Sequence, residues 1–242
     1  MPTLALFLAA LLAVVHLSAA RLRFLGCAPR SRWLSFASGL SVAYVFVHLL
    51  PGIAAGQHAL TRAGIAGEPT GADSWRVALL GLAVFYGLER LATHSRRRNA
   101  RGGEGDRTEA AVFRLHAGSY AVYNLLIGYL LVEQAGEGAT GLLLFWFAMA
   151  LHFLVNDYGL QQHHRERYTH RGRWVLAAAV LAGAVAALAF DVGPVAIALV
   201  TAFIGGGVVL NVLKEELPDD RESRFGPFAA GALGYAALLA LV

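Results

Sequence analysis

The sequence predicts an all-α protein embedded in a membrane, with about eight transmembrane helices. Of its 242 residues 57% are hydrophobic, the mean hydropathy is +0.55, and 15% are charged. A soluble domain carries about 25% charged residues. The apolar residues also lie in blocks long enough to cross the core of a bilayer. Inside lipid such blocks must be helical, because every backbone polar group needs a partner within the chain.

Eight apolar blocks follow one another along the chain, and together they predict a single membrane domain. The first block ends in small residues, as a signal peptide does, but its arginines follow the apolar run instead of preceding it. We therefore expect it to be retained as a span. The charged, glycine-containing stretch 94–110 is predicted to be a cytoplasmic loop. Spans are expected near residues 3–20, 34–55, 75–93, 111–132, 139–160, 174–190, 193–213 and 225–242.

Basic residues alternate between the two ends of these blocks. The connections after the first, third, fifth and seventh spans hold eighteen of the twenty Lys and Arg residues. Because basic residues are retained on the cytoplasmic side, these connections are predicted to lie inside and both termini outside. The basic pI then reflects topology, so we expect no nucleic-acid partner. The Ala- and Arg-rich composition with one lysine favours a bacterial protein, and hence the inner membrane.

Two segments of the chain are similar to each other. Residues 36–51 align without a gap with residues 203–218, matching Phe36 with Phe203, Gly39 with Gly206, and a terminal Leu-Pro pair in both copies. By the predicted topology the first copy runs outward and the second inward. Such a pair indicates an inverted repeat relating spans 1–3 to spans 6–8, as in many secondary transporters.

Six polar residues on the fourth and fifth predicted spans are the candidates for function, because polar and ionisable groups inside a membrane are costly. Their spacing of four residues places them on one face of each helix. Nitrogen and oxygen ligands of this kind suit zinc or another divalent first-row metal. The alternative is an inert hydrogen-bonded seam between the two helices. The six are His116, Tyr120, Asn124, His152, Asn156 and Asp157.

Three local motifs resemble the ZIP family of divalent metal transporters. GLSVAYVFVHLLPG at 39–52 is similar to the family's second span, and FYGLER at 85–90 to the end of its third. TAFIGGGVVLNVLKEELPDD at 201–220 resembles its seventh span. The resemblance covers nearly the whole chain. It implies eight spans with both ends outside and a variable basic loop between the third and fourth.

The resemblance also implies a rearranged metal site. His152 stands at the family's histidine position on the fifth span, whereas Phe153 and Asn156 replace its two glutamates. On the fourth span Ser119 and Tyr123 stand where the family has His and Asp. The six candidate residues are therefore expected to form a shifted site, with Asp157 or His116 substituting from one turn away.

Three functions are open at this point. The first is a ZIP-like carrier that moves divalent cations, zinc above all, into the cytoplasm by rocking of helix bundles, without enzymatic activity or a prosthetic group. Its expected partners are the bilayer and the metal ion, with a homodimer left open. The second is a ZIP-fold protein without transport, acting as a scaffold, sensor or regulator. The third is an intramembrane metal-dependent hydrolase using His48, His116, His152 and Asp157.

Overall fold

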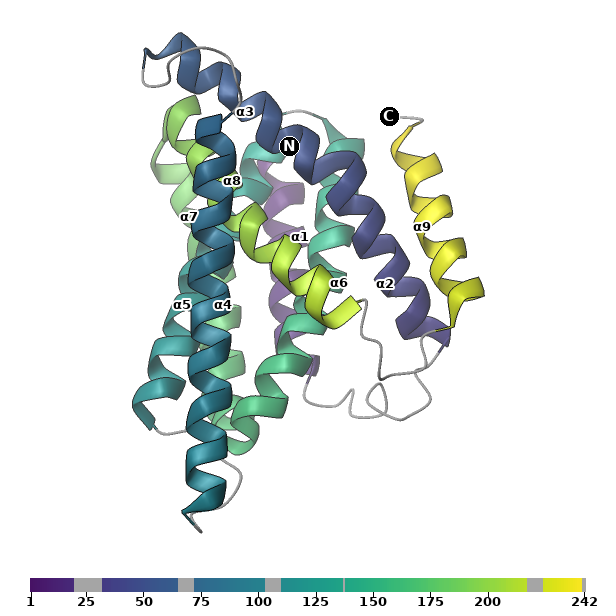
Figure 1. Ribbon diagram of the computed structural model, residues 1–242. Coiled ribbons are helices and arrows are strands. Elements are labelled where there is room, and N and C mark those ends of the chain that lie inside the picture. The colour runs from purple at the N-terminus through teal and green to yellow at the C-terminus, as the bar shows by residue number, and fades with distance from the viewer. Residues whose placement is uncertain (20–31, 65–71, 103–109, 137, 217–223, 241–242) are drawn as a thin grey trace. The chain divides into compact units, whose positions relative to one another are not determined.

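The computed structural model describes residues 1–19, 32–64, 72–102, 110–136, 138–216 and 224–240, apart from the side chains of 19, 34, 72, 155, 158–159, 162–166 and 215–216. These residues are almost entirely helical, and no strand occurs among them (Figure 1). The α-helices are α1 Pro2–Ala19, α2 Arg32–Tyr44, α3 Leu50–Arg62, α4 Ala72–Arg101, α5 Ala110–Gln134, α6 Ala139–Arg167, α7 Arg173–Ala189, α8 Pro194–Asn211 and α9 Phe225–Leu239.

The helices have the length and composition of membrane spans. Among the described residues, five segments are long and apolar enough to cross a bilayer: Ser35–Arg62, Asp73–Arg101, Ala110–Gln134, Tyr168–Ala189 and Pro194–Lys214. Three shorter apolar helices are Pro2–Ser18, Ala139–Leu154 and Phe225–Leu239. Large apolar side chains also face outward, as expected of a surface that contacts lipid. Trp33 is 81% exposed and Phe225 80% exposed.

Several helices are longer than the predicted spans. The prediction of a loop over 94–110 was wrong for residues 94–101, because α4 continues to Arg101. Residues 103–109 of that loop lie outside the described residues. Likewise α3 ends at Arg62 and α6 at Arg167, both beyond the predicted ends at 55 and 160. Hydropathy marks only the lipid-embedded part of a helix, and Arg, Gln and Glu are good helix formers beyond it.

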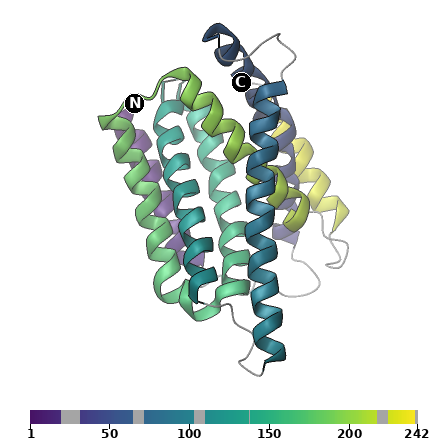
Figure 2. The ribbon, with the colours of Figure 1, turned by 60° about the vertical axis from the view of Figure 1, so that its left-hand side comes forward.

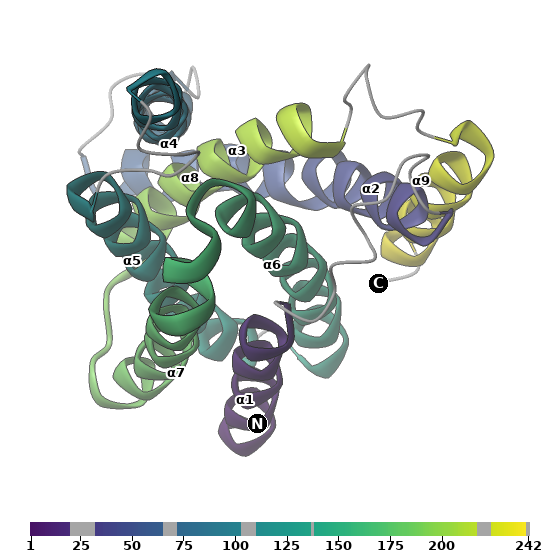
Figure 3. The same ribbon diagram turned by 90° about the horizontal axis from the view of Figure 1, so that it is seen from below.

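The chain divides into two compact units. The first, formed by Met1–Leu22 and Tyr86–Phe190, contains α1, α5, α6, α7 and the end of α4. Within it α7 packs against α5 and α1, and α1 also packs against α6 (Figure 3). A Cβ at Gly183 would lie 1.8 Å from the Leu125 carbonyl oxygen, and one at Gly128 2.0 Å from that of Val180. Glycine therefore permits the close approach of α5 and α7.

The second unit, formed by Arg23–Phe85 and Asp191–Val242, contains α2, α3, the start of α4, α8 and α9. In its first helix pair, α2 lies beside α9 (Figure 1). A Cβ at Gly39 would lie 1.9 Å from the Phe228 carbonyl oxygen, and one at Gly231 2.1 Å from that of Phe36. These two glycines allow the backbones of α2 and α9 to lie in direct contact.

A second pair in the same unit is built in the same way from α8 and the start of α4, which cross in Figure 2. A Cβ at Gly206 would lie 1.8 Å from the Ala78 carbonyl oxygen, and one at Gly81 2.0 Å from that of Phe203. Phe203 and Gly206 are the residues that the sequence alignment matches to Phe36 and Gly39. The residues paired by the alignment therefore make equivalent contacts: each glycine lies against a carbonyl of the neighbouring helix, and each phenylalanine carbonyl lies against a glycine of that helix.

In the part of the chain that the structure describes, three wide π-helical turns interrupt the helices. The α2 π turn, Val45–Leu49, joins α2 to α3, and the α6 π turn, Tyr168–Gly172, joins α6 to α7. The α8 π turn, Val212–Glu216, follows α8. The α2 and α8 π turns hold equivalent positions in the aligned segments, because each begins nine residues after the matched phenylalanine.

Candidate functional site

A buried polar cluster lies inside the first unit, among α1, α5 and α6. Its side chains are at most 6% exposed, although the surrounding helices are apolar. Buried polar groups persist where they find partners or serve a function. We call this set the polar cluster. Its members are His16, His116, Tyr120, Tyr123, Asn124, His152, Asn156 and Asp157.

Helical spacing explains how α6 contacts both α5 and α1 with polar or aromatic side chains. His152 and Asn156 are four residues apart and face Tyr123 of α5. Phe153 and Asp157 lie on the adjacent stripe and face α1, where the ring of Phe153 lies 4.4 Å from the ring of His16. One helix thus contributes to two adjoining hydrogen-bond groups.

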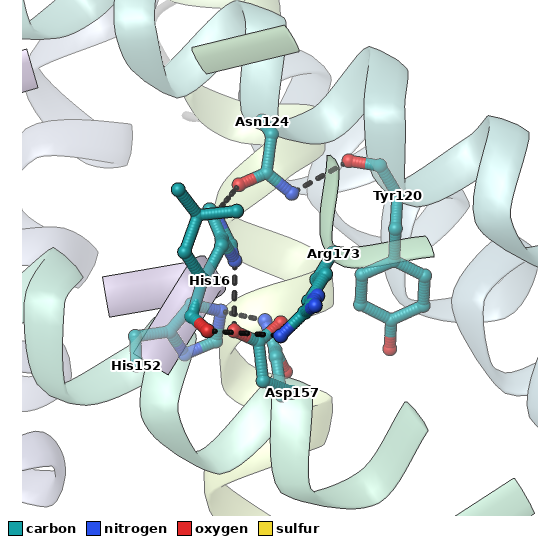
Figure 4. Close-up of polar contacts among 8 residues, drawn as sticks. His16, Tyr120, Asn124, His152, Asp157 and Arg173 are labelled. Carbon is teal, nitrogen blue, oxygen red and sulfur yellow. Dashed lines mark hydrogen bonds and ion pairs between the residues drawn. The ribbon is translucent and has the colours of Figure 1, made fainter. Parts of the chain in front are cut away.

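His16 is the centre of the first group (Figure 4). Its Nδ1 lies 2.8 Å from Asp157 Oδ2, and its Nε2 lies 2.7 Å from Asn124 Oδ1. His16 is fully buried, as is Asp157. The first span therefore takes part in the site, joining α5 to α6 through one imidazole ring.

The orientation of Asn124 decides where His16 carries a proton. Asn124 Nδ2 donates to the backbone carbonyl of Tyr120 at 2.7 Å, and a carbonyl oxygen only accepts. Asn124 therefore turns its own oxygen toward His16 Nε2. Because that oxygen also only accepts, His16 must carry a proton on Nε2.

A second proton lies between His16 and Asp157. A bare imidazole nitrogen and a carboxylate oxygen would repel at 2.8 Å, so a hydrogen must separate them. The pair is either an imidazolium facing a carboxylate or a neutral imidazole facing a carboxylic acid. In both forms its net charge is zero, which limits the cost of burial.

His152 has the opposite arrangement. Its Nε2 lies 2.8 Å from the Tyr123 hydroxyl and 2.8 Å from Asn156 Nδ2. Because the Asn156 amide donates, His152 Nε2 accepts and its proton sits on Nδ1. Metals bind neutral imidazole through such a lone pair. Tyr123 and Asn156 therefore occupy the direction from which a metal would approach, and both must turn aside for it to bind.

Asp157 keeps one oxygen without a hydrogen bond. Its Oδ1 is buried and makes no hydrogen bond of good geometry, and the same holds for Arg173 Nε. The Tyr168 hydroxyl lies close enough to this carboxylate to interact with it, although the two do not meet the geometry of a hydrogen bond. Arg173 reaches toward the cluster from the start of α7 and donates to the Leu17 carbonyl at 3.4 Å (Figure 4). This oxygen is the atom of the cluster best suited to take a further ligand.

All six predicted ligands lie in the polar cluster, and four of them are connected within it by side-chain hydrogen bonds. Asn124 and Asp157 meet through His16, and Asn156 bonds directly to His152. Tyr120 contributes its backbone carbonyl to Asn124. His116 lies one turn before Tyr120, nearer the start of α5, with its ring 5.1 Å from the ring of Tyr120.

Sequence reasoning missed the residues that other helices supply. His16 was visible as an ionisable residue inside an apolar span, but nothing in the sequence joined it to Asp157, which is 141 residues away. Arg173 and Tyr168 were assigned to the connection after the fifth span. Within the described part of the chain, no three His, Cys, Asp or Glu side chains are grouped so that they could hold a metal ion.

Comparison with known proteins adds no relative: no family model, no curated protein and no solved structure matches this chain. The resemblance to the ZIP family therefore stays a prediction that rests on its local motifs.

Proposed function

We propose that this chain is a ZIP-like secondary carrier of divalent cations, zinc above all, that moves its cargo into the cytoplasm across a bacterial inner membrane. The polar cluster supports the proposal. Ionisable groups within apolar helices are expensive, and they commonly mark ion pathways. Here three histidines and an aspartate lie buried within one unit.

The observation that carries the proposal is the open oxygen of Asp157. A divalent cation in a low-dielectric site needs anionic ligands, and Asp157 is the buried acidic residue in the described part of the chain. His152 faces α5 and Asp157 faces α1 in this structure, so a shared ion requires both side chains to turn. They would then supply one nitrogen and one oxygen, which are ligand types that zinc accepts. The remaining positions would be filled by the neutral oxygens of Tyr123 and Asn156 after they turn.

The architecture supports a carrier on separate grounds. Alternating access needs two bodies that move against each other, and the chain divides into two units with the polar cluster inside one of them. The matched glycine contacts and π turns of the second unit favour the inverted repeat of spans 1–3 and 6–8. The eight apolar helices, five long and three shorter, favour eight spans with both termini outside.

Metal content tests this proposal. Detergent-purified protein is loaded with zinc, desalted and analysed by elemental mass spectrometry, beside His152→Ala and beside His94→Ala as a control. His94 is an exposed histidine near the end of α4. We expect near-stoichiometric zinc in the parent and in the control, and none in His152→Ala. Equal zinc in all three proteins would contradict the site.

A second function is favoured by a different observation. The polar cluster is largely satisfied internally, since Asn124, Tyr123 and Asn156 already bond to the two histidines. Such a network also stabilises a scaffold, sensor or regulator that binds no metal. This alternative predicts no retained zinc in any variant, together with a marked loss of stability when His152 is replaced.

A further inference from the structure

The α2 π turn lies between two stretches of helix that have different partners. Before it, α2 is fixed to α9 through Gly39 and Gly231. After it, α3 packs on α8, where a Cβ at Gly56 would lie 3.2 Å from Ala198 Cβ. Farther along α3, the Gln57 side chain accepts the backbone N–H of Ser74 at 3.0 Å. The turn therefore separates two independently anchored segments.

Proline accounts for the position of this turn. Pro51 stands at the start of α3, one residue beyond Leu50, whose N–H bonds to the Val45 carbonyl across the wide π turn. In a regular α-helix the ring of Pro51 would crowd the carbonyl of Val47, and the proline has no N–H to offer it. A wide turn relieves that crowding at the cost of regular hydrogen bonding.

The same elements recur around the α8 π turn. Before it, α8 is fixed to α4 through Gly206 and Gly81. After it, the sequence reaches Leu217 and Pro218, the equivalents of Leu50 and Pro51. A π turn that arose by chance in one helix has no reason to recur at the equivalent position of the other.

From these contacts we infer that the α2 π turn is a hinge in the second unit, set by the Leu50-Pro51 pair, and that the α8 π turn is its equivalent in the aligned segment. The rigid part is the glycine-fixed pair α2–α9. The α2 π turn lets α3 tilt while this pair stays intact. The existence of the hinge rests on the geometry alone, and only its purpose in alternating access rests on the proposed function.

Amide hydrogen exchange at the α2 π turn tests the hinge directly. Full-length protein in lipid nanodiscs is followed by exchange mass spectrometry, beside Pro51→Ala and beside Pro194→Ala, which changes a proline at the start of α8. Amides of 46–50 should exchange about tenfold faster than those of 38–44, because opening is local. Pro51→Ala restores an N–H and should slow exchange at 46–50 at least about threefold, while Pro194→Ala leaves it unchanged. Equal exchange in the turn and in α2, or no effect of Pro51→Ala, would overturn the hinge.

A cross-link provides a second, independent measurement. Gly56→Cys with Ala198→Cys, in a Cys27→Ser background, ties α3 to α8 when oxidised. The hinge predicts slower exchange at 46–50 in the oxidised than in the reduced form, whereas equal exchange would count against it. Neither measurement involves metal or transport, so a failure of the carrier proposal would leave both results interpretable.

Discussion

At the scale of single residues, the polar cluster is explained by the hydrogen-bonding rules of its amide and imidazole groups. Asn124 can satisfy both Tyr120 and His16 in one orientation only, and that orientation places a proton on His16 Nε2. Asn156 has the opposite effect on His152, whose Nε2 accepts. Two histidines within one cluster therefore have opposite tautomeric roles, and each role can be tested.

The proton positions should be visible by nitrogen NMR. In protein labelled with 15N-histidine, the Nε2 of His16 should carry a proton and the Nε2 of His152 should not, because of their partners Asn124 and Asn156. His16→Gln and His152→Gln variants assign the two signals. A protonated Nε2 on His152 would show that Asn156 turns its oxygen, not its nitrogen, toward the ring.

The contact between His16 and Asp157 should also contribute to stability. Asp157→Ala leaves His16 Nδ1 buried without a partner, so we expect a loss of about 1–3 kcal/mol in the free energy of unfolding. Asp157→Asn should cost less, because its amide can donate to the same nitrogen. Thermal or denaturant unfolding in detergent measures both.

A double-mutant cycle provides the control for this contact. Replacing both partners, His16→Leu with Asp157→Leu, should cost less than the sum of the two single replacements, because no buried polar group then lacks a partner. If the two single losses in the free energy of unfolding simply add, the contact between His16 and Asp157 contributes no coupling energy.

At the scale of the elements, glycine positions decide which helices pack together. Among the described residues, four glycines in the second unit and two in the first lie so close to a backbone carbonyl of a neighbouring helix that a Cβ has no room. The Leu50-Pro51 pair accounts for the place where α2 widens into a π turn. These features were present in the sequence as an aligned Phe, Gly and Leu-Pro pattern, but the pattern alone did not show which helix each glycine would touch.

A pair of glycine substitutions tests this packing. Gly183→Ala places a Cβ 1.8 Å from the Leu125 carbonyl oxygen and should destabilise the first unit by about 1–3 kcal/mol. Gly118→Ala on α5 meets nothing within 4 Å and should be neutral or stabilising by up to about 1 kcal/mol. If the two variants have the same unfolding midpoint, α5 and α7 do not pack as described.

At the scale of the whole molecule, composition and hydropathy were enough to predict an all-helical chain with apolar helices, several of them long enough to cross a membrane. The predicted spans overlap the described helices, and one of them, 34–55, is divided by a π turn into α2 and α3. Composition and hydropathy did not predict helix ends such as Arg101 and Arg167, because hydropathy stops at the edge of the lipid while a helix can continue into water. Candidate ligands on α5 and α6 could be predicted from their spacing. His16 could not be placed, because its contact with α6 depends on tertiary packing.

The single cysteine offers a test of the predicted topology. Cys27 follows the first predicted span, and the distribution of basic residues predicts that it lies in the cytoplasm. In intact cells a membrane-impermeant maleimide should not label Cys27, but it should label Glu137→Cys in a Cys27→Ser background. Labelling of Cys27 in intact cells would reverse the orientation.

The central claim is that the polar cluster carries a divalent cation across the membrane, and zinc uptake into proteoliposomes tests it most directly. The account predicts time-dependent accumulation by the parent protein and by His94→Ala, and a fall to the level of protein-free vesicles for His152→Ala and Asp157→Ala. The two inactive variants must remain folded by exclusion chromatography and circular dichroism. Accumulation that is equal in all four proteins, or absent from the folded parent, would contradict the account.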